Sequence, residues 1–292
     1  MKKTIFLLGA IFTLSTNVFA EEVTEKKFKV DKISQNVTFE NRSGSKADIA
    51  ESAYLTTDVF FSYGKEYTFS IRAREYWEMD TDNGISGKDD RIELGAKRNF
   101  YFDNGVFGAG LKVRKQDKED RLILDLNYKY GLLSGWATPA YSSNDGGKDY
   151  FYLETMPLNL SLGKITVGPY WESIRGVGED KDYKYDKVHL RAYAPLYQGE
   201  KLSVNTEYRL GLNQKETTYN DKAKVYRTNY AVATNLDGTN YHRIYISANY
   251  KATENFDIYG YYGYEFSKWE TSKDSTRKSY YGEACLGWSY SF

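Results

Sequence analysis

The sequence predicts an all-β protein, a transmembrane antiparallel up-and-down barrel of about fourteen strands, or about twelve if some segments pair differently. Apolar and polar residues alternate along stretches of about 11 to 14 residues, longer than the strands of most soluble sheets. The polar faces of these stretches carry charges, and aromatic residues gather near the ends of the apolar faces. Aromatic residues make up 17% of the chain although its mean hydropathy is −0.66.

The first twenty residues have the features of a secretory signal peptide. Lys2 and Lys3 precede an apolar stretch, and Val18-Phe19-Ala20 supplies a small-residue cleavage site. We therefore expect residues 1–20 to be removed and residues 21–292 to form a single barrel domain, because no linker or solenoid repeat divides them.

The strands follow one another through short and long links. In order, the predicted strands are 27–40, 47–61, 66–78, 90–102, 106–117, 120–131, 134–143, 149–162, 164–175, 185–197, 201–214, 241–251, 255–269 and 278–292. Compact turn signals such as Asp103-Asn104-Gly105 alternate with longer links such as 79–89 and 215–240. An even number of strands places both termini on the periplasmic side. The alternation breaks phase around Asp31, Pro139 and Pro157.

The same alternation assigns the side chains that face the lumen. Inward basic residues of the third to sixth strands are Arg72, Arg74, Arg91, Lys97, Lys112, Arg114, Arg121 and Lys129. Further along the chain they are Arg191, Arg209 and Arg243, and the inward acidic residues are Glu93, Asp125, Glu207, Asp257, Glu265 and Glu283. A basic wall facing a more acidic wall would set up a transverse field in the pore. Alternatively, these charges pair with their neighbours and only keep the lumen wet.

Aromatic rings and the lone cysteine are also assigned to the lumen. Tyr193, Tyr245, Tyr259 and Tyr261 would offer faces on which sugars stack, and Cys285 would fill space.

Two stretches carry a resemblance to a known family. They are Leu190 to Leu196 (Leu-Arg-Ala-Tyr-Ala-Pro-Leu) with the following strand 202–212, and the C-terminal segment 287–292. The chain resembles the monomeric porins typified by outer membrane protein G. The resemblance implies a passive, monomeric outer-membrane channel for small hydrophilic solutes such as sugars and ions. It also implies a long sixth extracellular loop that can fold over the mouth, and 215–240 stands in that position.

The histidines depart from this family's pattern, in which a histidine pair near the sixth loop senses pH. Here the two histidines are His189 and His242, on the tenth and twelfth strands, and His242 shares the outward parity of Ile244. Gating by a histidine pair is therefore not expected.

Other functions remain as alternatives. The basic wall is similar to the arginine-lined lumen of oligogalacturonate porins, which pass acidic sugars, although no motif is shared. An adhesin would use the loop 215–240, whose inner part, Val225 to Thr234, could extend a β-hairpin beyond the membrane, although a lid on the channel is equally compatible with it. A barrel enzyme would need a histidine with an acid or a serine at the rim, and His189, which stands between Lys187 and Arg191, has neither in sequence.

The expected partners follow from the predicted class. They are outer-membrane lipids, small hydrophilic solutes and the barrel-assembly machinery, which would read the terminal Phe292. Nucleic acid is not expected, because 40 Lys+Arg balance 40 Asp+Glu. Neither a metal nor a cofactor is expected, since residues with metal-ligand spacing are absent from the sequence.

Overall fold

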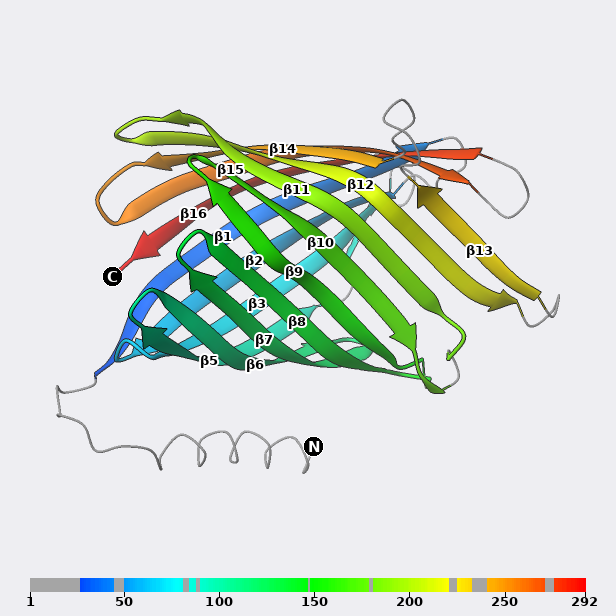
Figure 1. The fold of residues 1–292 in the computed structure, drawn as a ribbon, viewed down its shortest axis with the longest axis horizontal. Helices are drawn as coiled ribbons and strands as arrows, with labels where there is room; N and C mark the ends of the chain where they lie inside the picture. Colours follow the sequence, from blue (N-terminus) through cyan, green and yellow to red (C-terminus); the bar gives the residue numbers. More distant parts are fainter. Residues whose placement is uncertain are drawn as a thin grey trace.

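The computed structural model describes residues 27–44, 50–80, 84–87, 90–146, 148–178, 181–220, 225–232, 241–270 and 276–292. These residues form a closed antiparallel barrel of fourteen strands (Figure 1). The barrel strands are β1 (Phe28–Gly44), β2 (Ala50–Tyr63), β3 (Tyr67–Asp80), β5 (Arg91–Phe102), β6 (Gly105–Gln116), β7 (Glu119–Tyr130), β8 (Leu133–Asn144), β9 (Tyr150–Leu162), β10 (Ile165–Gly176), β11 (Lys184–Gln198), β12 (Leu202–Asn220), β14 (Tyr241–Lys251), β15 (Phe256–Glu270) and β16 (Thr276–Ser291). Each pairs with the barrel strand before and after it, and β1 closes the sheet against β16.

The prediction of an all-β barrel with fourteen strands is confirmed, and every predicted segment corresponds to one barrel strand. One short strand was not predicted, and another falls in the stretch 225–234 that the sequence offers as part of a β-hairpin. β4 (Gly84–Gly87) pairs with the end of β3, inside the predicted link 79–89. β13 (Val225–Val232) pairs with residues 213–220 of β12, so a hairpin occupies part of the predicted loop 215–240. The predicted signal peptide, residues 1–20, lies outside the described residues.

Tight turns join the strands at the end of the barrel where β1 begins and β16 ends (Figure 1). Gly131 and Gly163, in two of these turns, have φ angles of 55° and 63°. Glycine adopts this left-handed conformation without the steric cost that a side chain would impose. We therefore identify this end with the periplasmic side of the predicted topology.

The structure has register shifts at two of the three predicted breaks in alternation. The register of β1 against β2 shifts between Val30 and Lys32, which places a bulge at the predicted break near Asp31. β9 shifts against both of its neighbours in the stretch that contains Pro157, whose nitrogen carries no hydrogen for the ladder. The predicted break at Pro139 is wrong, because Pro139 pairs with Leu153 without a shift.

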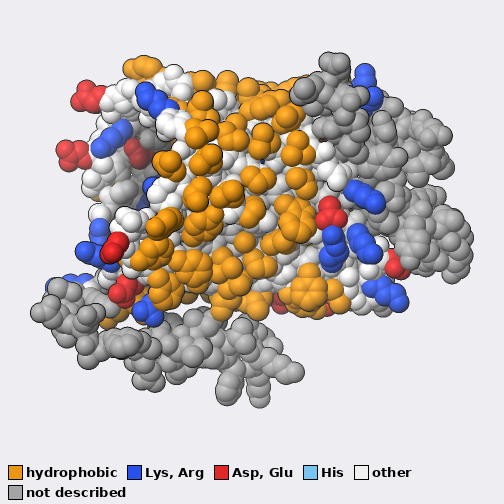
Figure 2. Space-filling view, in the orientation of Figure 1, with side chains coloured by type: hydrophobic (Ala, Val, Ile, Leu, Met, Phe, Trp, Pro, Cys, Tyr) orange, Lys and Arg blue, Asp and Glu red, His pale blue; other side chains and the backbone are white. Residues whose placement is uncertain are grey.

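The outer face of the barrel is an apolar belt. Exposed outward side chains along its middle include Ile71, Leu94, Leu122, Leu124, Ile244, Ile246 and Leu286. Figure 2 shows that hydrophobic side chains cover the central band of one face, while Lys, Arg, Asp and Glu lie toward its two edges. In hydrocarbon every backbone N–H and C=O needs an internal partner, and a closed sheet supplies them. The barrel is an integral protein of the outer membrane, where barrels with such a belt occur. Among the described residues, no helix is long and apolar enough to span a membrane.

Candidate functional site

The strand registers place the predicted lumen residues on one continuous face. Residues that lie opposite one another on paired antiparallel strands point to the same side of the sheet. Arg72 thus shares its face with Glu93, Arg114 and Arg121 through successive pairings, and Arg191 shares it with Arg209, Arg243 and Glu265. Their role in permeation stays a prediction, but their contacts can be described.

Most side chains of the basic wall are paired with a carboxylate. Arg72 binds Asp58 at 2.6 Å, Arg114 binds Glu93 at 2.8 Å, and Arg121 binds Glu119. Lys97 and Lys112 both reach Asp125, at 3.7 and 3.2 Å. For these residues the second interpretation from the sequence, pairing between neighbours, describes the structure.

Arg74 and Arg91 differ from the rest of this wall. They lie directly opposite one another on β3 and β5. Arg74 donates through Nε to Thr56 Oγ1 at 3.0 Å, and Arg91 donates through Nε to Gln116 Oε1 at 3.2 Å. Both partners are neutral, so positive charge accumulates at this point of the wall.

On the opposite wall, arginines lie among the carboxylates and bind them. Arg209 binds Glu207, and Arg191 lies 3.8 Å from the same carboxylate. Arg243 binds both Glu265 and Glu283, at 3.3 and 2.7 Å. Asp257 lies on the inward face near the periplasmic end of β15, opposite Ser289, and Lys129 lies near the same end of β7 and is exposed.

Glu283 is the centre of a hydrogen-bond network on this wall. It accepts bonds from the hydroxyls of Tyr245, Tyr261 and Tyr281, in addition to the bond from Arg243. Only 8% of the residue is exposed. A buried carboxylate needs such donors, because burial removes the water that would otherwise solvate it. The network therefore joins β14, β15 and β16 through one side chain.

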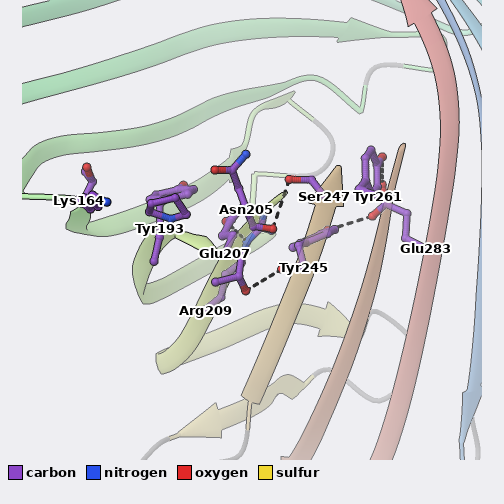
Figure 3. A pocket seen from close by; sticks show the side chains of 13 residues that line it. Lys164, Tyr193, Asn205, Glu207, Arg209, Tyr245, Ser247, Tyr261 and Glu283 are labelled. Carbon is purple, nitrogen blue, oxygen red and sulfur yellow. Dashed lines mark hydrogen bonds and ion pairs between the residues drawn. The ribbon is translucent and has the colours of Figure 1, made fainter. Parts of the chain in front are cut away.

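A bay of about 590 Å³ opens in the wall beside this network (Figure 3). Its labelled lining residues are Lys164, Tyr193, Asn205, Glu207, Arg209, Tyr245, Ser247, Tyr261 and Glu283. The ring of Tyr245 lies against Gly263 of the next strand, where any β-carbon would collide with it. Glycine thus allows the ring to lie close to the wall and leaves space in front of it.

His189 lies on the inward face as expected, but its side chain is shielded from the lumen. It is 1% exposed and is stacked between the rings of Tyr170 and Tyr241, at centroid distances of 4.2 and 5.7 Å. Arg191 Nε donates to His189 Nε2 at 2.8 Å. His242 lies on the outer face, with its Nδ1 2.6 Å from the hydroxyl of Tyr208. The two histidines therefore do not form a pair.

Cys285 is buried on the inward face opposite Thr38 and Tyr261, where it fills a small space.

Several inward carboxylates were missed at the sequence level. They are Glu40, Asp58, Glu119, Glu154 and Glu172, and all have hydrogen bonds on the lumen side. A signal was available for Asp58, because Ser52, Tyr54 and Thr56 precede it at alternating positions of β2. For Glu154 the shift in β9 disrupts the alternation. No cluster of three or more metal-ligating side chains is found among the described residues.

Neither a protein-family model nor a curated protein matches the chain. Among solved structures, it is similar to a bacterial polysaccharide outer membrane secretin, with 10% identity, a TM-score of 0.50, and coverage of 90% of this chain and 98% of that one. It is 12% identical to OmpT, an outer membrane protein of Vibrio cholerae, with a TM-score of 0.42 over 93% and 100% of the two chains. It is also 12% identical to an anion-selective porin from Comamonas acidovorans, with a TM-score of 0.42 over 92% and 100%. At these identities the likeness concerns the fold alone. The chain is thus a fourteen-stranded barrel of the outer-membrane type.

Proposed function

We propose that this protein is a passive outer-membrane porin, a water-filled channel for small hydrophilic solutes such as sugars and ions. The observation that carries the proposal is the contrast between the two faces of one closed sheet. The outer face is an apolar belt (Figure 2). The inner face carries charged and hydroxyl side chains on strands around the barrel, such as Arg114, Tyr170 and Glu283. A barrel that had only to be a membrane anchor could fill its interior with apolar side chains.

The lumen side chains bond along the wall. In the described part of the chain, inward hydrogen bonds and ion pairs join residues of one strand, as in Arg121–Glu119, or reach a neighbouring strand or the next but one, as in Lys97–Asp125 and Arg243–Glu283. Such bonds hold long side chains against the sheet. They support a lumen that stays wet between its walls, with the bay beside Tyr245 as one of its widenings.

Single-channel recording tests this function. The mature chain, residues 21–292, is refolded in detergent and inserted into a planar bilayer, with detergent alone as the control. We expect uniform current steps, and swelling of protein-loaded liposomes in glucose. If a barrel that is folded by circular dichroism shows no conductance at any pH or voltage, the proposal is wrong.

An adhesin is the alternative that one observation favours. The backbone of β12 and β13 forms a hairpin of eight paired positions beyond the barrel ladder between β12 and β14. Removal of residues 218–232, which leaves the part of β12 that pairs with β11 in place, should leave the current steps intact if the protein is a porin. Loss of cell attachment with no conductance in either form would favour the adhesin.

Three further properties belong to the proposal. The barrel is complete within one chain, which supports a monomer. The assembly machinery is expected to act on the C-terminal strand, and no nucleic acid or cofactor takes part. No residue is assigned a catalytic role, because His189 is enclosed by two tyrosine rings and an arginine.

A further inference from the structure

Arginines lie directly opposite other arginines at several places on the lumen wall. Arg114 faces Arg121 across β6 and β7, and Arg209 faces both Arg191 and Arg243. Arg74 faces Arg91 across β3 and β5. Like charges at directly opposed positions destabilise a sheet unless something compensates them. Each of these pairs therefore needs a counter-charge.

Carboxylates of the same wall compensate all but one of these pairs in the described chain. Glu93 and Glu119 bind Arg114 and Arg121. The row formed by Arg191, Arg209 and Arg243 is matched by Glu207, Glu265 and Glu283.

The Arg74–Arg91 pair is the exception. In the described residues each guanidinium is hydrogen-bonded through its Nε alone, and both acceptors are neutral. The guanidinium carbon of Arg74 lies 4.2 Å from the ring centroid of Tyr54, which supports it from one side. Among the described residues no hydrogen-bond partner is found for the Nη nitrogens of either arginine, so these nitrogens can meet a ligand. Glu78 lies on the same face of β3, four residues nearer the mouth.

Neighbouring arginines add to the positive potential around Arg74 and Arg91. Arg114 and Arg121 act electrostatically on Arg91 together with Arg74, and Glu93 is the carboxylate that acts most on it. Arg91 begins β5 and Gln116 ends β6, so the pair lies at the end of these strands that faces away from the termini. A lumen with low-dielectric walls focuses the field of such a cluster on a solute.

We infer that Arg74 and Arg91 form an anion-binding subsite that receives the carboxylate, sulfate or phosphate group of a passing solute. Opposed positions on paired strands hold their β-carbons about 5 Å apart. Arg74 leans toward Thr56 of β2 and Arg91 toward Gln116 of β6, so the two guanidiniums flank the space between them. The fixed fork of N–H donors on each guanidinium matches the oxygens of an oxyanion better than a lysine does. The subsite gives the proposed channel a substrate class, anionic small solutes, and in this sense the inference rests on the proposed function.

The test compares two sugars of similar size, glucuronate and glucose, as blockers of the single-channel current. We expect glucuronate to reduce the current at concentrations at which glucose does not. The double variant Arg74→Gln/Arg91→Gln should weaken the apparent affinity for glucuronate about tenfold, because it removes charged hydrogen bonds. Lys115→Gln is the matched control, since it removes a basic residue that is bound to Asp120 on the outer face and should change nothing.

A lysine variant and a competition with sulfate show which property of the two arginines binds the solute. Arg74→Lys/Arg91→Lys should keep the preference for anions in the reversal potential while glucuronate binds more weakly. Inorganic sulfate should compete with glucuronate if the charged group is sufficient, and failure to compete would assign part of the affinity to the sugar ring. The inference is wrong if glucose blocks equally, or if the double glutamine variant, folded as judged by heat-modifiable gel migration, keeps the affinity of the unaltered protein.

Calorimetric titration of glucuronate into the refolded barrel in detergent distinguishes this inference from the proposed function. Binding that depends on the two arginines, without any conductance, would retain the subsite and overturn the porin. Conductance without such binding would retain the porin and overturn the subsite.

Discussion

At the scale of single residues, the lumen is organised by a few carboxylates that each satisfy several donors. Glu283 is the clearest, because three tyrosine hydroxyls and Arg243 converge on it from neighbouring strands. Alternation alone correctly assigns its face, but it cannot identify its partners. These depend on the relative register of β14, β15 and β16, and the alternation within one strand does not carry its register against the neighbouring strands.

Replacement of Glu283 should therefore destabilise the barrel. Glu283→Gln removes the charge and two of the acceptor positions, so donors of Tyr245, Tyr261 and Arg243 lose a partner in a poorly hydrated place. We expect the free energy of unfolding to fall by about 2–4 kcal/mol. Urea titration in lipid vesicles measures it, with Glu254→Gln in an exposed periplasmic turn as the control. Equal midpoints for the two variants would contradict the assigned network.

Residue-level prediction also failed where the strand itself was irregular. Glu154 and Glu172 oppose one another and share the hydroxyls of Tyr152 and Tyr170, yet neither was predicted. For Glu154, the shift that contains Pro157 changes which residues of β9 point inward, and a strict two-residue period cannot follow such a change. β10 pairs with β11 without a shift, so the period of β10 was sufficient to place Glu172 on the inward face.

At the scale of elements, long alternating strands were predictable and the shortest strand was not. The last strand illustrates the first case, since Glu283, Cys285 and Ser289 oppose Leu286 and Trp288 along one uninterrupted period. β4 has only the four residues of Gly84–Gly87, too few for a period to be recognised. β13 lies in the stretch 225–234 that the sequence offers as part of a β-hairpin, and its partner in the structure is the extension of β12.

The contacts of Phe292, at the end of β16, lead us to expect a defect in assembly when this residue is deleted. Phe292 donates its backbone N–H to the carbonyl of Asp31 at 3.1 Å, and its ring packs edge-on to Tyr290. Deletion of Phe292 should lower the yield of folded barrel in cells before it alters the conductance of the molecules that do fold. The assay is heat-modifiable migration of outer-membrane fractions, followed by recording from the purified barrel.

Deletion of Met1 to Ala20 and replacement by a foreign signal sequence is the control for export. An unchanged yield of the Phe292 deletion would refute a role of this residue in assembly.

At the scale of the whole molecule, stability comes from the contrast between lipid on one side of a single sheet and water on the other. An exposed side chain in the middle of a strand therefore faces lipid, whereas in a soluble protein it would face water. Leu124, 38% exposed, lies near the middle of β7, whereas Leu132, 64% exposed, lies in the turn after it.

A charge at these two positions should have unequal effects. Leu124→Arg is expected to cost about 2–4 kcal/mol of unfolding free energy, and Leu132→Arg about 0–1 kcal/mol, because the cost of arginine on the lipid face falls from the midplane to the interface. Reversible unfolding in phospholipid vesicles measures both. In a soluble barrel the two variants would behave alike, so equal values would count against the membrane belt.

The rim of the barrel has different heights around its circumference. Beside the arginines, the link between β6 and β7 is only residues 117–118, whereas across the barrel β12 continues to Asn220. β3, which carries Arg74, continues to Asp80 and pairs there with β4, so the low part of the rim lies to the β6–β7 side of the arginines. An anion approaching from that side reaches the arginines through electrolyte. Salt screens such an approach over a Debye length of about 8 Å at physiological ionic strength. Added salt should then lengthen the interval between successive blockades by an acidic solute, while the duration of each blockade stays nearly constant.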